Sequence, residues 1–326
     1  MKKIQYEKRL SGLRAYIEDH GLTGALITSY ENRRYFCGFT GSSGYLLVTR
    51  DHAVLITDKR YTTQAKEQTV DCEIVEHSQD RLGLVADTMK RLGITSSVME
   101  SGMTAGEYFS LKEHLGDHRT VLEDEYFLEL RMVKDEWEIE ATREAIRRAE
   151  AMSFGTIVAS GARGAMAHGF PTNKVIENGD MVVVDFGVMY DGYCSDMTRT
   201  LLFGDISQEN RRIFNLVLES GKRAVEAVRP GVHSSEVEAA HRDVFIREGL
   251  DDYALRGLGH GIGLQIHECP RVQIGKDTVL RPNMIFTIEP GLYFPGVCGV
   301  RTEDDVLVTE SGVENLSHTP HEIHID

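Results

Sequence analysis

The amino-terminal third of the chain combines a helical pattern with short apolar runs. In RLSGLRAYIEDHG, residues 9–21, apolar side chains recur at helical spacing and the pattern stops at a glycine. Three runs of strand length follow, TGALITSY, GYLLVT and HAVLIT, with glycine and aspartate at the turns between them. This alternation is typical of a small α/β domain. We therefore predict an α/β domain over residues 1–128.

A long amphipathic helix near Lys134 begins the second part, which contains two similar passages. ENGDMVVVDFG, residues 177–187, and LRPNMIFTIEPG, residues 280–291, each run from a turn into a strand, a carboxylate and a glycine. This repeat suggests two half-domains related by a pseudo-two-fold axis. We predict that both belong to one domain over residues 129–326.

The helical stretches that precede the two passages are unequal. Before the second passage about 37 residues, 213–249, show helical spacing and are broken at an Arg-Pro-Gly sequence. Before the first passage only about 16 residues, 135–150, do so. The first half therefore lacks the equivalent of one helix.

Composition and charge limit the classes of partner. The chain has 326 residues, of which 41% are hydrophobic and 27% charged, as in globular proteins. With 51 acidic and 36 basic residues the net charge is −15, so we expect no nucleic-acid or membrane partner. The sequence shows no signal peptide or membrane span, and its five cysteines form no CxxC pair. We therefore expect free thiols and a cytoplasmic protein.

The stretch VVVDFGVMYDGYCSD predicts a hairpin that carries two aspartates on one face. Asp191-Gly192 is typical of a type I′ turn, and strands paired around it set Asp185 opposite Thr198. Asp185 and Asp196 then become diagonal neighbours. Two hairpin aspartates can simply face solvent, but the three valines before Asp185 indicate a buried strand. Buried carboxylates repel each other, so we expect a cation between them.

Further metal-binding side chains lie in three later segments. LGHGIGLQIHECP contains His260 and His267, TIEPG places Glu289 at a strand end, and GVRTEDD contains Glu303. Taken singly, each of these residues is more often structural. Together, hard oxygen donors with an imidazole suit Mn, Co or Zn ions. We predict two metal ions between the aspartates.

These motifs in combination resemble one family. DFGVMYDGYCSDMTRT, GHGIGLQIHE, TIEPGLY and GVRTEDDVLVT are similar to the signature of the pita-bread metallopeptidases, which include creatinase, aminopeptidase P and prolidase. NRRYFCGFTGSSGYLLVT and LITDKRYTTQA resemble the amino-terminal domain of the Xaa-Pro enzymes, which methionine aminopeptidases lack.

The resemblance implies an α+β fold. A pita-bread catalytic domain, with a curved and mostly antiparallel sheet covered by helices, would follow a smaller α/β creatinase-type domain. The smaller domain would restrict the cleft and contribute to a homodimer. The implied activity is hydrolysis of the bond between an amino-terminal residue and proline, by a water that bridges two divalent ions. Mn²⁺ is expected first, with Co²⁺ or Zn²⁺ as alternatives.

The resemblance also assigns residue roles. Glu289 would bind metal and help to deprotonate the attacking water. His168 would contact the substrate near the scissile bond, His267 would stabilise the tetrahedral intermediate, and Arg301 would orient ligands or substrate. The implied metal ligands are Asp185, Asp196, His260, Glu289 and Glu303.

Several alternatives stay open at this point. The chain could be a non-catalytic binding or scaffold protein on the same fold, or an aminopeptidase of the methionine type. Arg256 stands where relatives often have a histidine. The short first half could mean omitted residues, a tolerated deletion or a degenerate relative. We expect the tail with His318, His321 and His324 to be solvated.

Overall fold

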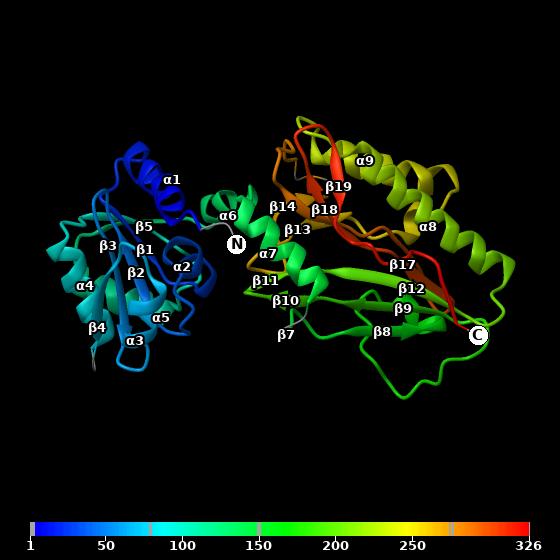
Figure 1. Cartoon of the computed structure of the whole chain (residues 1–326), viewed down its shortest axis with the longest axis horizontal. Coiled ribbons are helices and arrows are strands. Elements are labelled where there is room, and N and C mark those ends of the chain that lie inside the picture. Colours follow the sequence, from blue (N-terminus) through cyan, green and yellow to red (C-terminus); the bar gives the residue numbers. More distant parts are fainter. Residues whose placement is uncertain (1–3, 78–79, 149–150, 274, 276, 326) are drawn as a thin grey trace. The chain divides into compact units, whose positions relative to one another are not determined.

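The computed structural model describes residues 4–77, 80–148, 151–273, 275 and 277–325 (Figure 1). Contacts divide the chain into two compact units, with the division between Arg131 and Met132. Each unit has its own sheets and its own apolar clusters.

The amino-terminal unit is an α/β domain, blue to cyan in Figure 1. Its helices are α1 Tyr6–Asp19, α2 Tyr30–Cys37, α3 Thr62–Gln68, α4 Arg81–Arg91, α5 Ala105–Leu115 and, at the division, α6 Glu125–Met132. Its strands are β1 Gly24–Ile27, β2 Tyr45–Val48, β3 Ala53–Asp58, β4 Glu73–His77, β5 Ser96–Met99 and β6 Arg119–Leu122. They form a mixed sheet in the order β4-β3-β2-β1-β5-β6. The predicted first helix is α1, and the three predicted strands are β1, β2 and β3.

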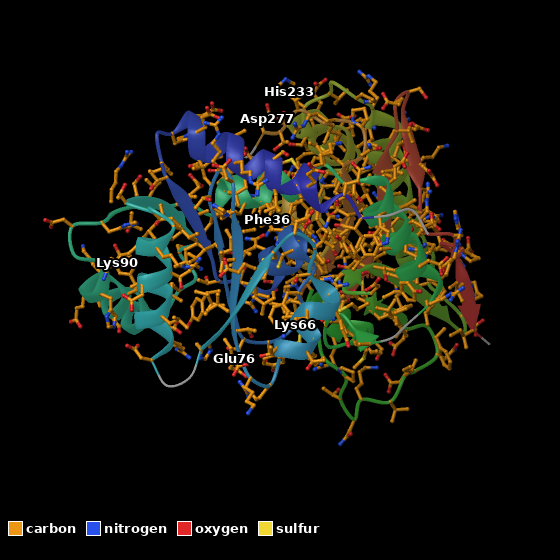
Figure 2. The ribbon with its side chains drawn as sticks, turned by 60° about the vertical axis from the view of Figure 1, so that its left-hand side comes forward. Phe36, Lys66, Glu76, Lys90, His233 and Asp277 are labelled. Atoms are coloured by element: carbon orange, nitrogen blue, oxygen red, sulfur yellow. The ribbon has the colours of Figure 1, made fainter. Side chains whose placement is uncertain are left out.

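The core of this unit follows the apolar runs of the sequence. Leu26, Leu47 and Val54 of the sheet pack with Val85 and Met89 of α4, and all five are shielded from solvent. Figure 2 shows a further core residue, Phe36, inside the unit, whereas the charged Lys66, Glu76 and Lys90 lie at its surface.

The carboxy-terminal unit, green to red in Figure 1, is built mainly of antiparallel strands with helices outside them. Its helices are α7 Glu136–Arg147, α8 Gln208–Ala227 and α9 Ser234–Arg247, with short 3₁₀ turns at Gly161–Ala165 and Asp251–Tyr253. The strands of its first half are β7 Ala151–Met152, β8 Ile157–Ser160, β9 Met181–Phe186, β10 Val188–Tyr190, β11 Tyr193–Cys194 and β12 Met197–Phe203. Those of its second half are β13 Gly259–Gly261, β14 Glu268–Val272, β15 Ile285–Ile288, β16 Gly291–Phe294, β17 Cys298–Arg301, β18 Asp304–Val308, β19 Val313–Asn315 and β20 Ile323–Ile325.

Two larger sheets organise this unit. One has the order β20-β12-β9-β8 and the other the order β14-β13-β15-β18-β19. The two similar passages of the sequence supply β9 to the first sheet and β15 to the second, so the repeat corresponds to equivalent strands. The histidines of the tail, His318, His321 and His324, are exposed as expected, and the end of the tail forms β20, which pairs in parallel with β12.

The two halves of this unit differ in their helices. In the second half, α8 and α9 have 20 and 14 residues, pack against each other and are separated at Pro230. In the first half, α7 has 12 residues and no further α-helix precedes β8 in the described part of the chain. Apolar side chains that follow α7 are exposed, including Met152 and Val175 at 67% and 76%. The inequality seen in the sequence is therefore present in the structure.

The start of α7 is held on both sides. The Asp135 carboxylate accepts hydrogen bonds from the backbone of Trp137 and Glu138, while the Glu138 carboxylate accepts one from the Asp135 backbone. Just before it, the Lys134 ammonium donates to the Glu268 carboxylate at 2.9 Å, with both side chains 1% exposed. This ion pair attaches the helix start to strand β14, which lies beside the site described next.

Candidate metal centre

The hairpin between β9 and β12 places two buried aspartates on one face. Asp191 and Gly192 have φ values of 43° and 71°, as a type I′ turn requires. Tyr190 pairs with Tyr193 and Asp185 with Thr198, so the predicted register is confirmed. The side chains of Asp185 and Asp196 are 8% and 7% exposed.

Residues from distant parts of the sequence converge on Asp196. Asp196, His260 and Glu303 are all buried, and each offers a ligand atom that lies within 4.8 Å of the other two. His260 Nε2 lies 3.7 Å from Asp196 Oδ2 and 3.5 Å from Glu289 Oε1. Glu289 follows β15 directly, and its side chain is 26% exposed. We call Asp185, Asp196, Glu289 and Glu303 the carboxylate cluster.

The carboxylate cluster has oxygens without hydrogen-bond partners. Asp185 Oδ1, Asp196 Oδ1 and Glu303 Oε1 are fully shielded from solvent and accept no hydrogen bond from the described residues. Such atoms cost roughly 1–3 kcal/mol each unless something binds them. Hard oxygen donors beside a neutral imidazole fit a divalent cation of the Mn, Co or Zn type. The residues present therefore fit a metal ion.

Burial and mutual repulsion dominate the electrostatics. Burial raises the pKa of Asp196 well above its usual range, and the charges of Asp305, Asp185 and Glu289 raise it further. The pKa of Glu303 is also well above its usual range, because of burial and then its carboxylate neighbours. Burial raises the pKa of Glu289 to about 7.

The imidazole of His260 is kept neutral. Burial lowers its pKa to about 3, so its Nε2 is free to act as a ligand. Its Nδ1 lies 3.1 Å from the Gly261 carbonyl oxygen, which accepts the Nδ1 proton in this tautomer. The backbone N–H of His260 donates to Thr287 Oγ1, and that hydroxyl donates to Glu289 Oε1 at 3.3 Å. The Gly261 carbonyl thus orients the imidazole of His260, and the Thr287 hydroxyl orients the carboxylate of Glu289.

Arg301 is the cation that contacts the carboxylate cluster. Its guanidinium pairs with the Asp185 carboxylate and donates to Thr198 Oγ1 at 3.0 Å. It also donates to the Ala167 carbonyl at 2.9 Å and to the Tyr293 hydroxyl at 3.1 Å. Arg301 therefore orients one aspartate and also holds the segment that leads into His168.

The two other expected catalytic histidines are exposed beside this cluster. The rings of His267 and His260 have centroids 4.3 Å apart and meet edge to face. Burial raises the pKa of Asp185, and the charge of His168 partly opposes that effect. Burial lowers the pKa of His267, and the charge of His168 lowers it further. Both exposed histidines thus face solvent near the carboxylates, whereas the expected ligands are more buried.

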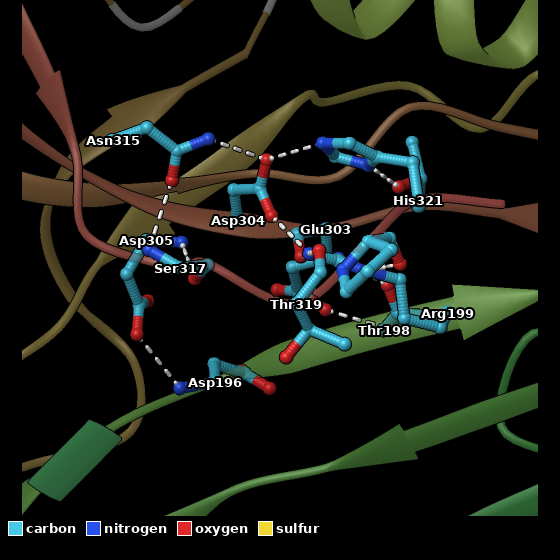
Figure 3. A network of polar contacts seen from close by, with 12 residues as sticks. Asp196, Thr198, Arg199, Glu303, Asp304, Asp305, Asn315, Ser317, Thr319 and His321 are labelled. Atoms are coloured by element: carbon cyan, nitrogen blue, oxygen red, sulfur yellow. Dashed lines mark hydrogen bonds and ion pairs between the residues drawn. The ribbon is translucent and has the colours of Figure 1, made fainter. Parts of the chain in front are cut away.

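Two residues near the cluster were missed in the sequence. Asp305 is fully buried, accepts a hydrogen bond from the Asp196 backbone at 3.1 Å, and has a pKa raised by burial to about 8 (Figure 3). Arg271 lies directly opposite His260 in the β13–β14 ladder. After burial, the Arg271 charge further lowers the pKa of His267. The signals in the sequence were the second aspartate of TEDD, which is Asp305, and the alternation after HECP, which leads to Arg271.

Comparisons with known proteins agree with this arrangement. Residues 118–310 match the model of metallopeptidase family M24, and residues 9–133 match the creatinase/prolidase N-terminal domain. None of the helices in the described ranges is both long enough and apolar enough to cross a bilayer.

Individual relatives align over nearly the whole chain. The Xaa-Pro dipeptidase of Pyrococcus furiosus is 33% identical over 351 positions, covering 97% of this chain and 99% of the relative. The structure of an Xaa-Pro dipeptidase from Bacillus anthracis has a TM-score of 0.95 at 36% identity, covering 98% of this chain and all of that one. An X-Pro aminopeptidase from Thermotoga maritima has a TM-score of 0.87 at 33% identity, with 94% and 98% covered.

The alignment with the Pyrococcus furiosus dipeptidase is relevant to the missing helix in the first half of the carboxy-terminal unit. It spans 351 positions whereas the chain has 326 residues, so at least 25 aligned positions have no residue in this chain. This number of positions is comparable to the length of one helix and its turn.

Proposed function

The chain belongs to metallopeptidase family M24, and we propose that it is an Xaa-Pro dipeptidase that uses two divalent metal ions. The predicted family, enzyme class and two-domain pita-bread fold are confirmed by the two domain matches and by the structural likeness to the Bacillus anthracis dipeptidase. The finer proposal is carried by one observation, the three buried carboxylate oxygens without partners.

The proposed ligands follow from the cluster. They are Asp185, Asp196, His260, Glu289 and Glu303. Four of them are carboxylates, Asp305 adds a fifth acidic group, and Arg301 offsets one charge. Two divalent ions would balance the four negative charges that remain. We expect Mn²⁺ first, with Co²⁺ or Zn²⁺ as alternatives, because the donors are mostly oxygen. When bound, the ions would polarise the scissile carbonyl and lower the pKa of water.

The other residues would act on the substrate and its proton. Glu289 is the expected ligand with a partly exposed side chain, so it is placed to accept a proton from water at the open side of the cluster. The exposed His168 and His267 would donate hydrogen bonds to substrate oxygen atoms. Arg301 would hold Asp185 in position through its ion pair.

The position and charge of Arg271 favour a dipeptide over a longer peptide as the substrate. In an Xaa-Pro dipeptide the proline carries a free carboxylate close to the scissile bond, whereas in a longer peptide that carboxylate is an amide. Arg271 stands opposite His260, and its positive charge lowers the pKa of Glu289 in opposition to burial. A guanidinium in this place can pair with the carboxylate of a dipeptide.

The remaining expectations are proposals of the same kind. We place the domain boundary at residues 128 and 129, which is supported by the nearby division of contacts after Arg131. We also propose a cytoplasmic homodimer. Sedimentation of the purified protein would test the dimer, and a single species of monomer mass would contradict it.

Hydrolysis of defined peptides tests the proposed function. The Mn²⁺-loaded protein should release alanine from Ala-Pro, and Glu303→Gln should lose this activity together with bound metal. Ala-Pro-Ala should be a poorer substrate. Wild-type protein that binds metal but cleaves neither peptide would contradict the proposal.

The role of Arg271 has its own control. Arg271→Ala should raise KM for Ala-Pro about tenfold or more, equal to about 1.4 kcal/mol, and leave cleavage of Ala-Pro-Ala almost unchanged. Arg281→Ala removes an exposed arginine from the same unit and should change neither value. Equal losses with both peptides would exclude carboxylate binding by Arg271.

A further inference from the structure

We propose that residues 317–325, the carboxy-terminal strap, position the metal centre through Arg199 and His321. This inference rests on the proposed function, because it takes Asp196 and Glu303 as metal ligands. The strap lies behind the carboxylate cluster and does not contribute a ligand. Its side chains and carbonyls instead hold β12 and β18, the two strands that directly follow these ligands.

Arg199 joins the strap to the ligand strands. The side chain is 3% exposed, and its Nη1 donates to the carbonyl of the ligand residue Glu303 at 2.6 Å and to that of Thr198 at 2.9 Å. Its Nε donates to the Pro320 carbonyl at 3.1 Å, and its Nη2 donates to the Thr319 carbonyl at 2.8 Å. The remaining bond joins Nη2 to Asp304 Oδ1 at 2.7 Å, so all five N–H donors of Arg199 are used.

His321 attaches the strap to the residues on either side of Glu303 (Figure 3). Its Nδ1 lies 2.9 Å from Thr302 Oγ1, and its Nε2 lies 3.2 Å from Asp304 Oδ2. Thr302 and Asp304 are the two neighbours of Glu303 in the sequence. Asn315 Nδ2 donates to the same Asp304 oxygen at 2.8 Å. We call Arg199, Asp304, Asn315 and His321 the Arg199 network.

A second path leads from the strap to Asp196. The Ser317 hydroxyl accepts a hydrogen bond from the Asp305 backbone at 3.0 Å. The Asp305 carboxylate in turn accepts one from the Asp196 backbone at 3.1 Å. Both steps are drawn in Figure 3. Beyond them, Ile323 to Ile325 pair with Leu201 to Phe203 of β12, so the strap is fixed along the strand that follows Asp196.

These contacts matter because the ligands belong to different sheets. β12 follows Asp196 in one sheet, and β18 follows Glu303 in the other. Across the junction, Glu303 N donates to the Thr198 carbonyl at 3.0 Å and Thr198 Oγ1 donates to Glu303 Oε2 at 2.7 Å. Arg199 and the strap add the bonds that keep this junction closed. Metal affinity depends on such supporting groups, whose loss typically costs about 10–100-fold.

Cobalt binding tests the proposal without relying on activity. Full-length wild-type, Arg199→Lys, His321→Ala and His321→Gln proteins would be titrated with Co²⁺ by calorimetry, with the visible absorption of Co²⁺ recorded. Lysine cannot reproduce five hydrogen bonds, so Arg199→Lys should weaken Co²⁺ binding about tenfold or more and change the spectrum. His321→Ala should weaken binding about threefold, because the His321 side chain is 43% exposed. His321→Gln keeps an N–H donor and should recover part of the loss.

Two reference variants separate the outcomes. His318→Ala changes an exposed histidine of the strap and should bind Co²⁺ like the wild type. Asp196→Asn should lose Co²⁺ binding; if it binds normally, the ligand assignment fails and the strap proposal with it. If Asp196→Asn loses Co²⁺ but folded Arg199→Lys and His321→Ala keep wild-type affinity and spectrum, only the strap proposal is overturned. If Arg199→Lys does not fold, the two His321 variants decide.

Discussion

Two groups of buried charge lie side by side in the carboxy-terminal unit, and they are satisfied to different degrees. In the Arg199 network, all five donors of the arginine are bonded and both oxygens of Asp304 have partners. In the carboxylate cluster, Asp185, Asp196 and Glu303 each have a shielded oxygen that accepts no hydrogen bond from the described residues. The same unit therefore contains one complete polar network and one incomplete one.

The difference shows how to separate a binding site from a structural charge network. Burying ionised groups is costly in both places, and the Arg199 network offsets the cost with internal bonds. In the carboxylate cluster, burial raises the pKa values of Asp196 and Glu303, and repulsion between the neighbouring carboxylates raises them further. An incomplete set of buried acceptors is thus a stronger indication of a ligand than burial alone.

Asp196→Asn should have the largest effect and should act in opposite directions on function and stability. Loss of a ligand should reduce kcat/KM by about 10³-fold or more, since a catalytic metal supplies several kcal/mol. The metal-free variant should melt a few degrees above the metal-free wild type, because one repelling carboxylate is gone. Elemental analysis, kinetics and thermal melts check this. A metal-free variant that melts lower would show that the cluster is not under repulsion.

Asp304→Asn should give the opposite sign of stability change. The substitution leaves the Arg199 guanidinium buried without its counter-charge, at a cost of about 3 kcal/mol in the free energy of unfolding. Urea unfolding of the metal-free protein measures this value. A cost under 0.5 kcal/mol would mean that the Arg199 network is not a structural ion-pair network and that the contrast with the cluster is false.

Metal addition should stabilise the wild type by a smaller amount. At a free Mn²⁺ concentration of 100 times Kd, mass action predicts about 2.7 kcal/mol. The melting temperature of the wild type should rise with Mn²⁺, while that of Asp196→Asn should not. An equal rise in both proteins would place the bound ions outside the carboxylate cluster.

His168→Ala should have the smallest effect of the four changes. The side chain is exposed and is not an expected ligand, so bound metal should stay constant while kcat falls about 10- to 100-fold, or 1.4–2.7 kcal/mol. Metal content and steady-state kinetics are the measurements. Loss of metal in this variant would move His168 into the ligand set.

Much of the site could be predicted because its residues lie in short patterns with strong local rules. The Asp191-Gly192 turn has a narrow conformational requirement, and the turn alone determines the register that brings Asp185 opposite Thr198. The equivalence of the two similar passages followed from the same run of turn, strand and carboxylate. Strand alternation in the amino-terminal unit likewise gave β1, β2 and β3.

The remaining features depend on contacts between distant residues. Nothing local in the sequence shows that Arg199 reaches the carbonyls of Thr319 and Pro320, or that Asp305 accepts a bond from Asp196. The exposure of the three tail histidines could be predicted from the polar sequence, whereas the pairing of β20 with β12 could not. Local periodicity gives no information about such partners.

The strap also sets an order for biosynthesis. Arg199 and its partner Thr319 are 120 residues apart in the chain, and β20 comes later still. At roughly 5–20 residues per second, a ribosome needs on the order of ten seconds to extend the chain from one to the other. During that time the guanidinium of Arg199 lacks the carbonyls that later accept from it. The metal centre can therefore be completed only after the ribosome has synthesised the strap. Assembly of the centre is thus a late step in the folding of each new chain.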